Sequence, residues 1–92
     1  MVRIKRLVLD VLKPHQPDAL ECTKALARLG VDYRIKLTMT EMDERTQTLQ
    51  IVIQGEDLDF ERIKETITNM GCSLRSIDEV EATGAPGTTT ES

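Results

Sequence analysis

The chain has 92 residues, of which 39% are hydrophobic and 30% charged, and Tyr33 and Phe60 are its only aromatic residues. A chain of this length forms one domain with a thin core, and its net charge of −4 opposes binding to nucleic-acid phosphates. It lacks a run of about 18 apolar residues, which opposes a transmembrane helix.

The first half of the chain predicts a strand, a helix and a second strand. Residues 3–12 alternate between apolar and mixed side chains, which is typical of a strand with one buried face. Pro14 and Pro17 interrupt this pattern. Pro17 suits the first position of a helix that is expected to stop at a left-handed Gly30. Residues 31–40 then alternate strictly and form the clearest strand pattern of the chain.

The second half repeats this arrangement after a polar hairpin turn at residues 41–45. Residues 48–54 alternate again and predict a third strand. Asp59 is the expected N-cap of a second helix that stops at Gly71, and residues 72–80 predict a last, less regular strand. The expected buried stripe of this helix consists of Phe60, Ile63, Ile67 and Met70.

The order of these elements predicts an α+β fold, the ferredoxin-like βαββαβ sandwich. Two strand-helix-strand units interleave, and right-handed crossovers favour an antiparallel sheet of order 4-1-3-2 with both helices on one face. We expect the domain to span residues 1–82. Residues 83–92, rich in Gly, Thr and Ser, are expected to form a disordered tail.

The sheet face away from the helices is predicted to be half apolar. Apolar patches ringed by charges are typical association surfaces, so we expect self-association through this face or a sheet edge, with a solvated face as the alternative. The predicted central strands carry no aromatic residue, which opposes RNA recognition by base stacking. The residues expected on this face are Ile4, Val8, Leu12 and Val52, with Arg6, Asp10, Arg34, Lys36, Gln50 and Gln54.

Three residues near the first crossover form a candidate ligand site. Asp10, Lys13 and His15 lie between the first strand and the first helix, and a helix N-terminus favours a small anion. The alternative is an ordinary surface histidine. No Gly-rich phosphate loop, nucleophile elbow or HExxH motif occurs, so we expect no enzymatic activity.

Acidic residues at the start of the second helix and in the last strand form a candidate metal site. Oxygen-rich clusters are what Ca²⁺ requires, whereas acidic first turns and solvated charge clusters are the ordinary alternative. The candidate ligands are Glu56, Asp57, Asp59 and Glu79, with Glu81 at the same pole.

The two cysteines and the N-terminus point to a reduced, cytoplasmic protein. Cys22 and Cys72 have neither zinc-site nor disulfide-framework spacing, so we expect two reduced core residues. Asp10, Lys13 and Pro14 interrupt the first apolar stretch too early for a signal peptide.

Three stretches taken together resemble a small archaeal family, domain of unknown function 211. They are residues 8–15 (VLDVLKPH), Gln54-Gly55 followed by Leu58-Asp59-Phe60, and residues 76–80 (SIDEV), within a match over about residues 3–82. The resemblance implies a ferredoxin-like fold, ring-like homo-oligomers and bound calcium in some members. It implies no established activity.

We therefore expect a non-enzymatic homo-oligomerising module that binds a divalent cation or a small ligand at subunit boundaries. Two alternatives stay open, a ligand-sensing regulatory module and an accessory subunit of an enzyme complex. Thermal stabilisation by one metabolite would favour the first alternative, and a stable heteromeric partner would favour the second.

Overall fold

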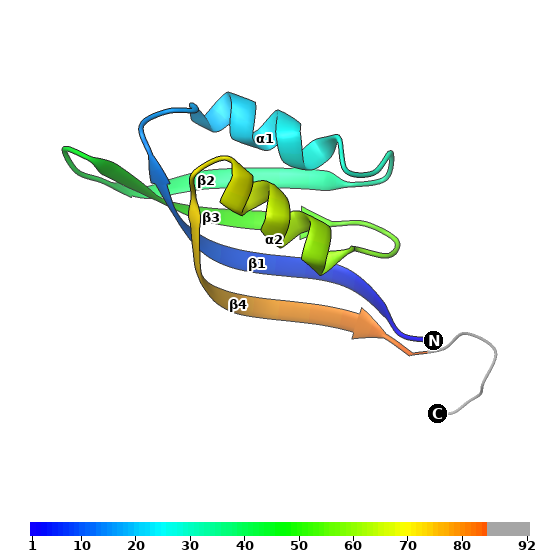
Figure 1. The fold of residues 1–92 in the computed structure, drawn as a ribbon. Coiled ribbons are helices and arrows are strands. Elements are labelled where there is room, and N and C mark those ends of the chain that lie inside the picture. The colour runs from blue at the N-terminus through cyan, green and yellow to red at the C-terminus, as the bar shows by residue number, and fades with distance from the viewer. Residues whose placement is uncertain (85–92) are drawn as a thin grey trace.

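The computed structural model describes residues 1–84, which form a four-stranded antiparallel sheet with two helices on one face (Figure 1). The elements are β1 (Arg3–Pro14), α1 (Ala19–Ala27), β2 (Arg34–Met42), β3 (Thr46–Gln54), α2 (Phe60–Asn69) and β4 (Ser73–Thr83). The strand order β2-β3-β1-β4 is the predicted order read from the other edge. The ferredoxin-like α+β fold is therefore confirmed.

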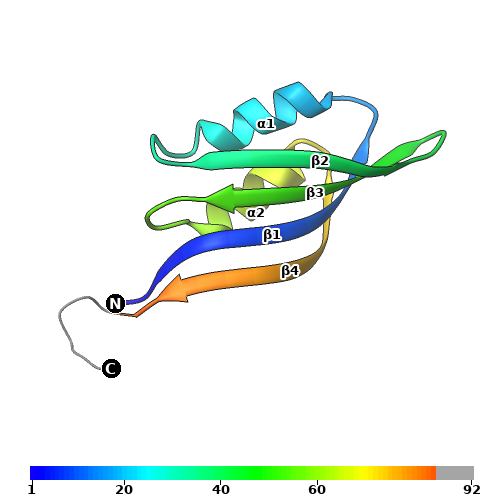
Figure 2. The ribbon, with the colours of Figure 1, turned by 180° about the vertical axis from the view of Figure 1, so that it is seen from behind.

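The core lies between the helices and the sheet, and the other face of the sheet is bare (Figure 2). Side chains of β1 and β3 alternate between the two faces of the sheet, and the apolar side chains at odd-numbered positions lie under the helices. The buried residues of this core cluster are Leu7, Leu9, Val11, Cys22, Leu26, Leu49, Ile51, Ile53, Leu58, Ile63, Ile67 and Cys72. Phe60 and Met70, predicted on the buried stripe of α2, are only partly buried at its rim.

Both helices begin at aspartate caps. The Asp59 side chain accepts a hydrogen bond from the backbone N–H of Arg62, as predicted, and Gly71 stops α2 with φ +82°. The predicted start of α1 at Pro17 is wrong by two residues. Asp18 caps this helix, since its side chain accepts a hydrogen bond from the backbone N–H of Glu21. A carboxylate can satisfy a free N–H group of the first helical turn, whereas proline has no side-chain acceptor.

Gly30 does not stop α1, which was the prediction. The helix ends at Ala27, and Gly30 makes room for an aromatic ring, since a Cβ there would lie 2.6 Å from Tyr33 Cδ1. Val31, predicted as the first residue of a strand, is fully exposed in a turn, and β2 begins only at Arg34. Period-2 alternation does not show where pairing to the next strand starts.

The open face is less apolar than predicted. Ile4 packs against the core instead, because a register shift between Ile4 and Arg6 in the pairing with β4 reverses the alternation. Val8 is buried among its neighbours, although it lies on the open face. Leu12 and Val52 are half-buried, so this face offers little continuous apolar surface.

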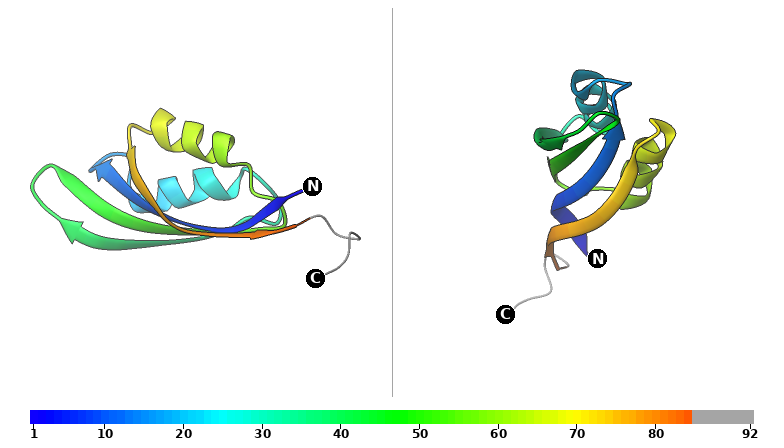
Figure 3. Two further views of the ribbon diagram at one scale, coloured as in Figure 1. Left: turned by 90° about the horizontal axis from the view of Figure 1, so that it is seen from below. Right: turned by 90° about the vertical axis from the view of Figure 1, so that its left-hand side faces the viewer.

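The helices do not cover the whole length of the sheet. The β2–β3 hairpin extends beyond the helices (Figure 3). The last strand has three register shifts, as its irregular pattern predicted, and its final residue Thr83 pairs with Arg3. Thr83, the first residue of the predicted tail, thus belongs to β4, and residues 85–92 of that tail lie outside the described residues. Neither of the two helices in residues 1–84 is long and apolar enough to cross a bilayer.

Candidate functional site at the charged end of the sheet

A hollow of about 280 Å³ lies at one end of the sheet, where charged residues from all four strands or their ends meet. Lys5 comes from β1, Asp32 precedes β2, Glu56 follows β3 and Glu81 lies on β4. The complete lining is Lys5, Asp32, Arg34, Gln54, Gly55, Glu56 and Glu81.

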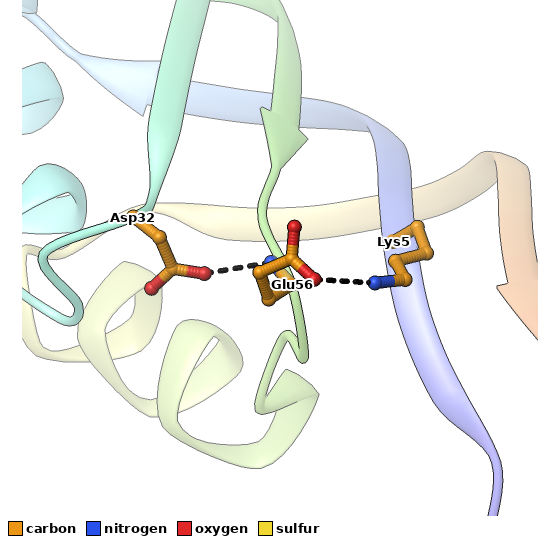
Figure 4. Close-up of polar contacts among 3 residues, drawn as sticks. All are labelled: Lys5, Asp32 and Glu56. Atoms are coloured by element: carbon orange, nitrogen blue, oxygen red, sulfur yellow. Dashed lines mark hydrogen bonds and ion pairs between the residues drawn. The ribbon is translucent and has the colours of Figure 1, made fainter. Parts of the chain in front are cut away.

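The polar groups of this hollow are connected to one another (Figure 4). Lys5 Nζ donates to Glu56 Oε1 at 2.8 Å, and the backbone N–H of Glu56 donates to Asp32 Oδ2 at 2.6 Å. The hydrogen bond from Lys5, together with its charge, lowers the pKa of the Glu56 carboxyl. Lys5 is therefore partly neutralised by Glu56, while Asp32 holds the backbone of the β3–α2 loop.

The sequence builds this loop around a glycine. A Cβ at Gly55 would lie 2.8 Å from Leu58 Cδ2 and 3.3 Å from Asp32 Oδ2, so a side chain there would displace both. The N–H of Gly55 donates to the backbone oxygen of Lys5, which fixes the loop to β1. Close packing at Gly55 thus brings Glu56 within reach of Lys5.

The four predicted metal ligands do not converge within one copy. Glu56 pairs with Lys5, Asp59 caps α2, and Glu79 accepts from Arg6 Nε at 2.7 Å. Asp57 is exposed in the loop. Among residues 1–84, no three His, Cys, Asp or Glu side chains form a group that could hold a metal ion. Calcium binding stays a prediction, in which a neighbouring copy or water supplies the remaining oxygens.

The three predicted ligand-binding residues point in different directions. Asp10 lies on the open face, 3.5 Å from Arg75. Lys13 is fully buried, and its ammonium group donates to three backbone oxygens of the crossover, those of Pro14, His15 and Pro17.

The imidazole of His15 faces the β2–β3 hairpin. Its Nε2 lies 3.0 Å from the backbone oxygen of Glu44, which can only accept, so this nitrogen carries the proton. Its Nδ1 lies 3.4 Å from the side-chain amide nitrogen of Gln47. His15 therefore ties the first crossover to the hairpin, and ligand binding by Asp10, Lys13 and His15 stays a prediction.

Comparison with known proteins identifies the family of this chain. The model of the family DUF211, described as uncharacterised ArCR, matches residues 5–86. The chain belongs to the DUF211 family. An uncharacterised protein of Methanocaldococcus jannaschii, MJ0319, is 39% identical to it over 79 residues, which are 86% of this chain and 81% of that protein. The resemblance drawn from the three sequence stretches is thus confirmed, and it carries no activity with it.

Two features of this DUF211 chain escaped the sequence reasoning. Lys13 continues the odd-numbered series Leu7, Leu9 and Val11, and this parity was a signal that its side chain points into the core. Asp32 was assigned to a strand, which hid its contact with the backbone of Glu56. No short-range pattern gives that contact, because it joins two separate loops.

Proposed function

We propose that this DUF211 protein is a self-assembling module in which the sheet of one copy continues into the sheet of the next. Its edge strands, β2 and β4, run antiparallel to each other. Two copies placed side by side in the same orientation therefore present an antiparallel pair, like every pair within the sheet. An exposed edge offers unpaired N–H and C=O groups for such contacts.

The charges of the open face favour this arrangement. Two rows cross the strands, one formed by Arg34, Gln54, Arg6 and Glu81 and the other by Lys36, Val52, Val8 and Glu79. Each row begins with a cation on β2 and ends with a carboxylate on β4. If the rows continue from β4 of one copy onto β2 of the next copy, Glu81 lies opposite Arg34 of that copy and Glu79 lies opposite its Lys36. Opposite charges on neighbouring strands attract.

The helix-side face favours the same register. Its two corresponding rows consist of Ile35, Ile53, Leu7 and Val80, and of Leu37, Ile51, Leu9 and Ile77. Ile77 and Val80 are 45% and 53% exposed at the β4 edge. Continued rows would place Val80 beside Ile35 and Ile77 beside Leu37 of the next copy. The agreement of both faces on one register is the observation that carries the proposal.

Such an interface joins the β4 edge of one copy to the β2 edge of the next. Since these two edges differ, the same contact can be repeated from copy to copy. A repeating head-to-tail contact closes into a ring when the rotation between copies allows it and otherwise grows as a filament. We therefore propose a ring-like homo-oligomer rather than a two-fold dimer. The role is structural, without catalysis.

A divalent cation at the boundary completes the proposal. Ca²⁺ needs roughly six to eight oxygen ligands, more than one copy gathers. Glu81 and Asp57 have no ion-pair partner among residues 1–84, and a net charge of −4 per copy accumulates on assembly. Calorimetric titration of Ca²⁺, with particle size followed by light scattering at raised salt, tests this part. Absence of both heat and size change would refute it while leaving the edge contact open.

A charge-swap experiment tests the edge contact. One variant carries Glu79→Lys and Glu81→Lys on β4, and the other carries Arg34→Glu and Lys36→Glu on β2. By native mass spectrometry, we expect wild type to form multiples of the subunit mass and each variant alone to be monomeric. An equimolar mixture should assemble with alternating subunits, because each basic edge again meets an acidic one.

The control removes the effect of net charge. Glu61→Lys with Glu65→Lys makes the same charge change as the β4 variant, on exposed positions of α2, and should assemble like wild type. A monomeric wild type at high micromolar concentration would overturn the proposal. So would two variants that assemble alone as wild type does.

A further inference from the structure

Three cations surround a hollow of about 320 Å³ on the open face of the sheet. Arg34 and Arg6 lie on either side of Gln54 in one row across β2, β3 and β1, and Lys36 lies two residues further along β2 than Arg34. The complete lining is Arg6, Arg34, Ile35, Lys36, Val52 and Gln54. We propose that this hollow is a binding site for a small polyphosphate anion.

Most of the positive charge in this hollow has no partner within the chain. The Nε of Arg6 donates to Glu79 at 2.7 Å, whereas Arg34 and Lys36 form no ion pair with any of residues 1–84. Arg34 and Lys36 are also exposed, so a ligand in solvent can reach both. Neighbouring cations repel one another, and a bound anion relieves that repulsion. The hollow is thus a local positive site on a chain whose net charge is −4.

The spacing of the cations fits several linked phosphoryl groups. Neighbouring strands lie about 4.8 Å apart, so the backbones at Arg34 and Arg6 are about 10 Å apart, with Gln54 between them. Lys36 lies roughly 7 Å from Arg34 along β2. A planar guanidinium group can donate to two phosphate oxygens at once. A chain of phosphoryl groups can therefore contact all three cations, which a single phosphate is too short to do.

The surroundings restrict the ligand to its phosphoryl groups. Glu79 and Glu81 follow the cations on the β4 side of the same rows, which opposes a long nucleic-acid strand. Tyr33 and Phe60, the only aromatic residues of the chain, do not line the hollow, so a nucleotide base has no ring on which to stack. Inorganic triphosphate and the triphosphate group of ATP should therefore bind alike.

Two of these cations also take part in the proposed edge contact. That contact places Arg34 and Lys36 opposite Glu81 and Glu79 of the next copy, so polyphosphate and a second copy compete for the same side chains. Polyphosphate should consequently favour separated copies. This regulation rests on the proposed function, whereas the binding site itself lies within one copy.

Calorimetric titration of the full chain with inorganic triphosphate tests the site. We expect one triphosphate per chain, an affinity for ATP within about threefold of that for triphosphate, and no heat with adenosine. Orthophosphate should bind at least about tenfold more weakly, because it reaches fewer of the cations. All titrations use buffers without divalent metal and at one ionic strength, since salt screens exposed charges.

A matched pair of double variants separates the site from general charge effects. Arg34→Gln with Lys36→Gln should weaken triphosphate binding at least about tenfold, because charge-assisted hydrogen bonds are lost. Arg62→Gln with Lys64→Gln removes the same charges from exposed positions of α2 and should bind triphosphate as wild type does. Three outcomes would overturn the proposal: no heat at millimolar triphosphate, equal losses in both double variants, and an affinity for ATP more than about tenfold above that for triphosphate.

Light scattering of the same samples tests the competition with assembly. We expect triphosphate to reduce the particle size of assembled wild type more than sodium chloride does at equal ionic strength. An assembled protein that binds triphosphate without any change in size would overturn the competition. A wild type that is monomeric throughout would refute the proposed function instead, and the heat of binding would still decide whether the site exists.

Discussion

The hydroxyl group of Tyr33 accepts a hydrogen bond from the backbone N–H of Asp59 at 2.8 Å. Tyr33 lies just before β2 and Asp59 is the N-cap of α2, so the bond joins the two halves of the fold. The ring of Tyr33 also fills the space over Gly30. One side chain thus positions both the turn after α1 and the start of α2.

Tyr33→Phe should remove this bond and keep the ring packing. We expect the free energy of unfolding to fall by about 1 kcal/mol, the usual net value of one hydrogen bond. Urea denaturation measures it. Gly30→Ala should cost about 1–3 kcal/mol, because the added methyl group forces the ring to move. A Tyr33→Phe protein as stable as wild type would show that solvent replaces the bond without cost.

Lys13→Met should be strongly destabilising, although it replaces a charge with an apolar side chain of similar length. The change leaves three inward-facing backbone oxygens without their donor. We expect a loss of about 3 kcal/mol or more, since buried groups without a partner pay their full desolvation cost. Lys64→Met on the exposed side of α2 is the matched control and should change stability by less than about 0.5 kcal/mol.

Two alanine substitutions test the orientation of α2. Ile63→Ala removes a fully buried side chain and should cost about 3–4 kcal/mol. Phe60→Ala should cost only about 2 kcal/mol, because this ring is partly exposed at the rim of the core. Chemical denaturation of both variants gives the order. A larger loss for Phe60 than for Ile63 would mean that the helix is rotated from the orientation described above.

Acid should loosen the β2–β3 hairpin through Asp43. The N–H groups of Thr46 and Arg45 donate to this carboxylate and lower its pKa from the ordinary 3.8. A lowered folded pKa gives stability that is present above the ordinary pKa and lost as the pH falls through the folded one.

Asp43→Asn should therefore show a smaller drop in melting temperature than wild type from about pH 5 to about pH 2. Asp57→Asn, an exposed position in the β3–α2 loop, is the control and should keep the wild-type acid response. Equal pH dependence in wild type and Asp43→Asn would contradict the assignment.

Much of the fold could be predicted from short-range patterns. Alternation gave the strands, the Asp59 cap and Gly71 gave the ends of α2, and the order of elements gave the sheet. Each of these signals depends on residues a few positions apart, which is the range that backbone geometry and capping control.

The remaining features depend on contacts between distant parts of the chain. The register shift that turns Ile4 inward exists only because β4 pairs irregularly with β1. The hollow at the charged end needs the close packing of Gly55 and the reach of Asp32 to another loop.

The crossover between β1 and α1 is poor in backbone hydrogen-bond donors, and a lysine side chain supplies donors in their place. Residues 14–17 contain two prolines, so this segment has four carbonyl acceptors but only two backbone donors. The ammonium group of Lys13 supplies three N–H groups from the strand just before it. Ordering of the end of β1, where Lys13 lies, and closure of the crossover are consequently one event. The loop acquires its shape only when its neighbouring strand has placed Lys13 in the core.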